Sequence, residues 1–191
     1  MKAALAQLSC TGTPLVGLTV IERRRREDSR GSFSRLFCAD ELDAAGIAMS
    51  IAQINESFTR RRGSIRGLHF QYPPYAEAKL VMCILGEIFD VAVDLRRNSP
   101  TFLKWHAEHL SEANGRSLFI PAGFAHGFQT LTDDCRLVYL HSAPYSPGSE
   151  GGLSARDPSL RIEWPLPIGE LSHRDANHAA LDAEFSGLDV K

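Results

Sequence analysis

Apolar residues recur at every second position in short runs of this chain, and turn-forming residues separate the runs. The clearest example is 86–95, where four apolar side chains fall on one face: Phe89, Val91, Val93 and Leu95. The residues between them, Asp90, Ala92 and Asp94, fall on the other face, and a turn at 98–100 follows. A period of two is typical of strands in an antiparallel sheet. The pattern therefore predicts β-structure.

Similar runs rich in Val, Ile, Phe and Thr occur throughout the chain. We expect strands within 15–22, 32–38, 50–59, 64–71, 80–95, 103–111, 116–121, 123–132 and 135–142. Many short, closely spaced strands predict a sandwich or barrel. Helical patterns are few, at 39–48 with its acidic first turn and at 176–185. No repeat or linker divides the chain, so 1–191 is predicted to form a single, mainly β domain.

Composition narrows the classes of partner and compartment. The 191 residues carry a formal net charge of −2, which gives no general attraction to nucleic acid or to an anionic membrane. The apolar runs are too short for a signal sequence or a membrane span. The scattered cysteines form no CxxC pair and predict free thiols: Cys10, Cys38, Cys83 and Cys135. We therefore expect a cytoplasmic protein that binds neither nucleic acid nor membrane.

The stretch RGLHFQ, 66–71, places an imidazole in a predicted strand. Facing a barrel interior, His69 could serve as general base, as metal ligand or as a satisfied core residue. Strict alternation turns Arg66 away from His69, yet Gly67 is a place where a β-bulge can re-aim one of the two side chains. Both side chains can then share a cavity.

A metal site is not expected. Small metal-binding barrels gather several His and carboxylate ligands, whereas His69 has only Glu77 nearby. His106 and His109 are spaced so that the two side chains of a strand point to opposite faces. In 118–131, His126 alternates with two phenylalanines, and it could bind a ring or a phosphate or be a buried, hydrogen-bonded residue.

Several long segments, in the same order and at compatible spacing, resemble the dTDP-4-dehydrorhamnose 3,5-epimerase family. They are RGLHFQ, EAKLVMCILGEIFDVAVDLRRNSPTF, LFIPAGFAHGFQTL, VYLHSAPYSPGSEGG and IEWP. The resemblance runs from about Asp28 to Asp175. It implies a cupin-type antiparallel β-barrel with a few short helices, without metal or cofactor and usually homodimeric. Such an enzyme inverts C3 and C5 of a nucleotide-linked 4-keto-6-deoxyhexose by removing and returning protons.

The resemblance also implies catalytic roles. Epimerisation beside a ketone needs a base, a donor for the developing enolate oxygen and an acid on the opposite face of the ring. His69 matches the base, and Asp175 of SHRDANH matches the carboxylate that orients it. Lys79 matches the cation near the substrate's oxygens, and Tyr139 matches the acid.

Further positions match substrate-binding residues of the family. Arg66 and His126 match residues that contact the nucleotide sugar, and Tyr145 matches an aromatic residue of the same pocket. In QINESF, Gln53 and Asn55 match residues of a stretch that contacts the base.

The segment DSRGSFSRLF resembles one in which an arginine and an aromatic side chain reach the nucleotide across a dimer interface. Arg30 and Phe33 take these places, which implies a homodimer with composite active sites. Arg35 and Glu56 depart from the family pattern, where Glu and His are familiar. These departures leave the nucleotide base open between thymidine and cytidine or another base. The alternative functions, which similar barrels also support, are a C3-only or C5-only epimerase on a dTDP- or CDP-linked sugar, a 3,4-ketoisomerase, and a non-catalytic sugar-nucleotide-binding cupin.

Overall fold

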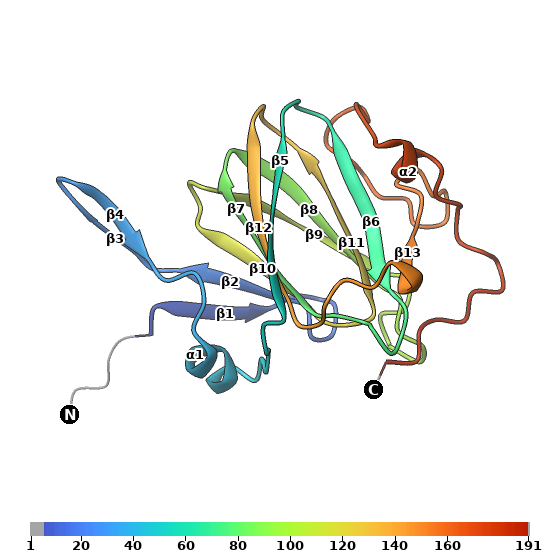
Figure 1. Cartoon of the computed structure of the whole chain (residues 1–191), viewed down its shortest axis with the longest axis horizontal. Helices are drawn as coiled ribbons and strands as arrows, with labels where there is room; N and C mark the ends of the chain where they lie inside the picture. The colour runs from blue at the N-terminus through green and yellow to red at the C-terminus, as the bar shows by residue number, and fades with distance from the viewer. Residues whose placement is uncertain (1–5, 191) are drawn as a thin grey trace.

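Two antiparallel β-sheets face each other in the computed structural model, which describes residues 6–190 (Figure 1). The first sheet contains β1 (Leu8–Gly12), β2 (Thr19–Arg23), β10 (Arg116–Ile120), β7 (Lys79–Leu85), β12 (Cys135–His141) and β5 (Gln53–Thr59), in that order. The second contains β13 (Glu150–Gly152), β6 (Ile65–Gln71), β11 (Phe124–Thr130), β8 (Glu87–Asp94) and β9 (Trp105–Ser111). The predicted mainly β, antiparallel cupin-type barrel is confirmed.

Each predicted run overlaps a strand, and the run 80–95 overlaps two. β7 and β8 belong to different sheets, and the chain passes from one to the other at Gly86. Gly86 has a φ of +79°, and a Cβ there would lie 2.6 Å from the Thr132 hydroxyl, so a larger residue is strained at this crossing. The strands that the sequence pattern missed are β1, β13 and β3 (Arg25–Asp28).

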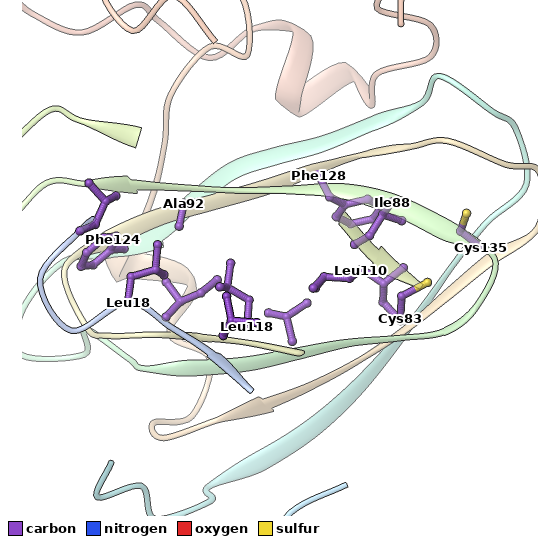
Figure 2. Packing of buried hydrophobic residues seen from close by; sticks show 14 residues of the cluster. Leu18, Cys83, Ile88, Ala92, Leu110, Leu118, Phe124, Phe128 and Cys135 are labelled. Carbon is purple, nitrogen blue, oxygen red and sulfur yellow. The ribbon is translucent and has the colours of Figure 1, made fainter. Parts of the chain in front are cut away.

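The core between the sheets is built from inward-facing residues of both (Figure 2). Val81, Leu118 and Leu137 come from the first sheet, and Ile88 and Phe128 come from the second. Because the two faces of a strand alternate, these residues fill one layer while their neighbours point outward. The core thus fixes the spacing of the two sheets that also form the walls of the pocket described below.

The second sheet is covered on its outer face as well. Phe89, Val91, Val93 and Leu95, predicted to share a face, all pack there against segments that follow β12, including Leu160 and Leu188. Asp90 and Asp94, on the opposite face, are nevertheless fully buried, because the barrel interior lies on that side. Sheets with both faces covered bury even the polar half of an alternating pattern.

Two helices are present in residues 6–190, apart from a 3-10 turn at Pro147–Ser149. The prediction for 39–48 is confirmed by α1 (Ala39–Ala44), which packs Leu42 against the outer face of the first sheet. The helix predicted at 176–185 is wrong. α2 (His173–Ala176) ends there, and the backbone that follows bonds instead to the segment after β13: the Leu181 amide donates to the Asp157 carboxylate at 2.5 Å.

A hairpin of β3 and β4 (Gly31–Ser34) extends away from the barrel (Figure 1). It carries Phe33, whose side chain is among the most exposed large apolar groups in the structure. None of the helices in the described part of the chain has the length and apolarity to cross a membrane. All four cysteines are free, as predicted, and Cys83 and Cys135 are buried.

Candidate active site

A pocket of about 510 Å³ opens between the two sheets. The first sheet supplies Asn55, Glu56, Ser57, Lys79, Tyr139 and His141 to its lining. The second sheet supplies Arg66, His69, His126 and Phe128, and the region of α2 supplies Ser172, Arg174 and Asp175. Residues from distant parts of the sequence therefore converge on one space with a wall from each sheet.

The side chain of His69 meets the buried carboxylate of Asp175. His69 Nε2 lies 2.8 Å from Asp175 Oδ1, and the Gly67 amide donates to Oδ2 at 3.2 Å. The β6–β11 register shifts between the His69 and Arg66 pairings, and Gly67 has a φ of +121°. The expected irregularity at Gly67 is thus confirmed, and it lets Arg66 and His69 line the same pocket.

The contact with Asp175 sets the tautomer of the imidazole. Burial by itself raises the pKa of Asp175, but hydrogen bonds and charge from His69, Gly67 and Arg174 outweigh it and hold this pKa well below its usual range. The ionised carboxylate only accepts hydrogen bonds, so Nε2 of His69 carries the hydrogen. The lone pair of the neutral ring is consequently on Nδ1, the arrangement that a general base needs.

Two residues near this pair were missed by sequence reasoning, although both lie in the quoted segment SHRDANH. Arg174 places Nη2 3.0 Å from His69 Nε2 and Nε 3.3 Å from Asp175 Oδ1. Its Nη1 donates to Glu150 at 2.7 Å. The ring of His178 lies edge-on to the ring of His69, with centroids 5.7 Å apart. α2 and the turn that follows it bring these side chains to His69, which no local sequence pattern reveals.

Tyr139 stands on the opposite wall, on β12. Its hydroxyl lies 2.9 Å from the Ser57 hydroxyl. Burial raises the pKa of Tyr139 above that of a free phenol, and the hydrogen bond with Ser57 offsets only part of this rise. The phenol therefore stays protonated at neutral pH and can donate a proton into the pocket.

Lys79 is a buried cation of the first sheet, held by a buried anion. Its Nζ lies 3.2 Å from Glu77 Oε1 and donates to the backbone carbonyl of His69 at 3.3 Å. Because both charges are largely removed from water, they interact more strongly than a surface pair. The ammonium group is thus fixed beside the strand that carries His69.

His126 forms a second imidazole–carboxylate pair. Its Nε2 lies 2.7 Å from Asp90 Oδ1, and both side chains are buried. His126 is also the cross-strand partner of His69 in the β6–β11 ladder. It is thus a buried, hydrogen-bonded residue, one of the alternatives left open by the sequence, and it also lines the pocket. Its contact with a ring or a phosphate stays a prediction.

Two of the predicted binding residues lie outside the pocket lining, whereas Arg66 is part of it. Arg66 donates through Nε to the Thr59 hydroxyl at 2.9 Å. Gln53 accepts from the Tyr145 amide at 2.8 Å, and the Tyr145 hydroxyl donates to Glu150 at 3.0 Å. Neither Gln53 nor Tyr145 is among the residues that line the pocket, although Asn55 is.

Arg30 and Phe33 are not brought to this pocket within one chain. They lie on the projecting hairpin, where Arg30 pairs with Asp28 at 2.6 Å. Among the described residues, one group has metal-ligand character, since His69, Asp175 and His178 hold ligand atoms within 4.8 Å of one another. The expectation that catalysis needs no metal stays a prediction.

Comparison with known proteins identifies relatives along most of the chain. The sequence profile of the dTDP-4-dehydrorhamnose 3,5-epimerase family matches residues 12–183. A dTDP-4-dehydrorhamnose 3,5-epimerase of Sinorhizobium fredii is 43% identical over 163 residues, which cover 85% of this chain and 84% of the relative. A dTDP-4-dehydrorhamnose 3-epimerase of Streptomyces niveus is 38% identical over 174 residues, covering 90% of this chain and 84% of the relative.

A solved structure is similar throughout the fold. The dTDP-6-deoxy-D-glucose-3,5-epimerase of Legionella pneumophila, in complex with dTDP-4-keto-L-rhamnose, superposes with a TM-score of 0.89. It is 37% identical in sequence, and the match covers 96% of this chain and all of that one.

His141 generates a prediction about stability. Burial, followed by the charges of Lys79 and His126, lowers the pKa of this imidazole to about 4. Between pH 6.5 and 4 the unfolded chain therefore binds more protons than the folded one, so the free energy of unfolding falls as the pH is lowered through this range. His141→Gln removes this titrating group, so the free energy of unfolding should fall less between pH 6.5 and 4. Denaturant unfolding at several pH values measures this free energy.

The matched control is His173→Gln, at an exposed position of α2. This variant should show the same pH dependence of the free energy of unfolding as the parent. His178, whose pKa is also lowered, first by burial, accounts for part of the remaining fall. Equal pH dependence in the parent and in His141→Gln would contradict the role given to His141.

Proposed function

The chain belongs to the dTDP-4-dehydrorhamnose 3,5-epimerase family, and on that premise we propose that it inverts C3 and C5 of a dTDP-linked 4-keto-6-deoxyhexose. The reaction converts dTDP-4-dehydro-6-deoxyglucose to dTDP-4-dehydrorhamnose within one catalytic domain, 1–191. One observation carries the proposal: an oriented imidazole and a protonated phenol stand on walls formed by different sheets. A sugar ring between them presents one face to each.

The first step is removal of a proton by His69. The ketone at C4 acidifies the protons on C3 and C5, and Nδ1 of His69 accepts one of them. Asp175 stabilises the imidazolium that forms, because it already accepts a hydrogen bond from Nε2. Lys79 lies close enough to this strand to stabilise the negative charge that develops on the C4 oxygen.

The second step is return of a proton from the other side. Tyr139 donates its phenolic proton to the carbon on the face opposite His69, which inverts the configuration. The Ser57 hydroxyl, 2.9 Å away, stabilises the negative charge of the resulting phenolate, which then regains its proton from water. The two steps at C3 and at C5 are alike, and they need only proton transfers, so no cofactor or metal takes part.

Polar groups around the pocket bind the nucleotide sugar. Arg66 and His126 contact the sugar diphosphate side, and Asn55 lies on the adjacent strand β5. Gln53 and Tyr145, joined to each other at 2.8 Å, extend this surface beyond the pocket. The free cysteines suit the reducing cytoplasm, where we place the enzyme.

The remaining nucleotide contacts come from a second subunit. The β3–β4 hairpin projects from the barrel, and Phe33 is 73% exposed although it is a large apolar residue. A phenylalanine this exposed on a projecting element is stabilised if a second surface buries it. We place Phe33 and Arg30 against the pocket of the partner in a homodimer with composite sites.

The function is tested by proton exchange. With dTDP-4-keto-6-deoxyglucose in D₂O, the parent enzyme should place deuterium at C3 and C5 and yield the doubly inverted sugar, as NMR reports. His69→Asn should lose both exchanges by about 100-fold or more, because no base remains. Asp175→Asn should act in the same direction, because an amide does not balance the imidazolium.

Other outcomes of this experiment have definite meanings. Exchange at C3 alone would assign a 3-epimerase, like the Streptomyces niveus relative, and movement of the ketone to C3 would assign a ketoisomerase. Binding without exchange would identify a non-catalytic cupin. Near-parent exchange in His69→Asn would mean that the base is another residue.

Tyr139→Phe separates inversion from exchange. The substitution keeps the ring and removes only the hydroxyl, so the packing of β12 should change little. A single base can exchange a proton on one face without changing configuration, so this variant should retain His69-dependent deuterium incorporation but accumulate far less inverted product. NMR of the product mixture measures both quantities. Formation of the doubly inverted sugar at the parent rate would exclude Tyr139 as the acid.

Composite sites are tested by mixing inactive subunits. His69→Asn subunits lack the base, and Arg30→Ala/Phe33→Ala subunits lack the hairpin contacts. If each site uses a hairpin from its partner, every mixed dimer contains one intact site, so an equimolar mixture should recover about a quarter of the parent activity. A mixture of His69→Asn with Tyr139→Phe, whose defects lie in the same chain's pocket, is the control and should recover none. No recovery in either mixture, or a fully active monomer by light scattering, would contradict the proposal.

A further inference from the structure

His178 is a titratable residue that the mechanism does not use. Its Nε2 is buried, and no residue among 6–190 forms a hydrogen bond with it. The nearest anionic atom is Asp175 Oδ1, 3.7 Å away, which is too far for a hydrogen bond. A buried nitrogen aimed at a carboxylate without bonding to it calls for an explanation.

The backbone opposite His178 leaves room for this ring. A Cβ at residue 152 would lie only 2.2 Å from the ring, so only glycine fits there. Gly152 is also the cross-strand partner of His69 in the β13–β6 ladder. The ring of His178 therefore lies over the strand beside His69, and its position is set by packing rather than by a hydrogen bond.

The three side chains together have the chemistry of a zinc site. Their ligand atoms, two imidazole nitrogens and one carboxylate oxygen, lie within 4.8 Å of one another. Ligand atoms of a tetrahedral zinc ion stand about 3.3 Å apart. The distances from Asp175 Oδ1, 2.8 Å to His69 and 3.7 Å to His178, lie on either side of that value. Small side-chain rotations are enough to gather the three ligands around one ion.

We propose that His69, Asp175 and His178 form an inhibitory zinc site, in which a zinc ion binds directly behind the catalytic base. A zinc ion on Nε2 of His69 replaces the hydrogen on that nitrogen, so the neutral ring carries its hydrogen on Nδ1. Nδ1 then has no lone pair to accept a proton from the substrate. The number of protons on the ring is unchanged, and no oxidant or further reactant is required.

Arg174 competes with the ion. Its guanidinium lies 3.0 Å from His69 Nε2 and 3.3 Å from Asp175 Oδ1, so it occupies the place of a cation beside both ligands. The side chain is half exposed, and Nη1 of the same guanidinium is bonded to Glu150. Arg174 can therefore turn out into solvent, but this movement breaks the Glu150 contact. Zinc binds only when Arg174 is displaced. The occupancy of the site therefore depends on the zinc concentration.

Zinc binding is measured first without substrate, on chelator-treated protein, by calorimetry with zinc and by the visible absorption of added cobalt. We expect one ion per chain. His178→Phe, which keeps a ring without nitrogen, should weaken binding at least about tenfold. His178→Gln repeats the test if the phenyl ring does not fit against Gly152. His173→Ala, which removes an exposed histidine two residues before Asp175, should bind as the parent does.

Arg174→Gln provides a test in the opposite direction. It removes the competing charge, so zinc should bind more tightly than to the parent. Parent-like affinity in the His178 variants, or an equal loss in His173→Ala, would overturn the site and indicate an adventitious surface ion. Weaker binding in Arg174→Gln would overturn the role of the guanidinium.

Inhibition, unlike binding, rests on the proposed function. Zinc should lower kcat and leave KM for the nucleotide sugar nearly unchanged, because the ion lies on the Asp175 side of the base and not in the place of the sugar. A chelator should restore the activity fully, and His178→Phe should be active and resist zinc. If zinc binds in a His178-dependent way to a protein with no epimerase activity, the proposed function fails and the site stands. Inhibition through an increase in KM alone would overturn the proposed placement.

Discussion

The carboxylate of Asp175 joins parts of the chain that lie 106 residues apart. It accepts hydrogen bonds from the His69 ring and from the Gly67 amide, so it fixes both a side chain and the irregular backbone next to it. Helix α2, which carries Asp175, has four residues and is far too short to be stable alone. Its position comes from the Ser172 side chain, which accepts from the Asp175 amide, and from backbone bonds to the start of β6.

The same design recurs around the pocket, where three basic groups each have a buried carboxylate partner. His69 has Asp175, and the other two pairs are His126 with Asp90 and Lys79 with Glu77. Burying such charges costs free energy unless each is paired and hydrogen-bonded. The pairing fixes the positions of the groups before substrate arrives, which is what electrostatic catalysis requires. The apolar layers on both faces of the second sheet hold these costly pairs in place.

The sequence could predict what depends on local pattern. Strands in which apolar and polar residues alternate, such as β8, and the acidic start of α1 were predictable because their own residues decide them. Helix 176–185 was not, because Leu181 and Phe185 have helical spacing but pack on the outer layer of the second sheet while the Leu181 amide binds Asp157. The short strands β1 and β13 also depend on tertiary pairing.

The residues of the candidate site likewise fall into those that the sequence could predict and those that it could not. His69, Asp175, Lys79 and Tyr139 were expected because the motifs around them resemble a family. Their convergence in one pocket is a property of the fold. Arg174, His141 and His178 lie within segments that resemble the family, but the resemblance assigned no role to them. Arg174 and His178 come from α2 and the turn after it, His141 comes from the inward face of β12, and only the folded chain brings these elements together with His69.

A neutral imidazole oriented by a carboxylate is a good base and also most of a zinc site, because both roles need a lone pair on nitrogen beside a negative charge. What separates the roles is the third group. A second imidazole favours binding of a metal ion. A guanidinium instead occupies the position of the ion with its own positive charge, and it cannot accept lone pairs from the ligands. Here both are present, Arg174 at 3.0 Å from His69 and His178 at 3.7 Å from Asp175. The balance between proton transfer and metal binding at this pair is therefore set by which of the two side chains lies nearer, and the Glu150 contact that anchors Arg174 favours proton transfer.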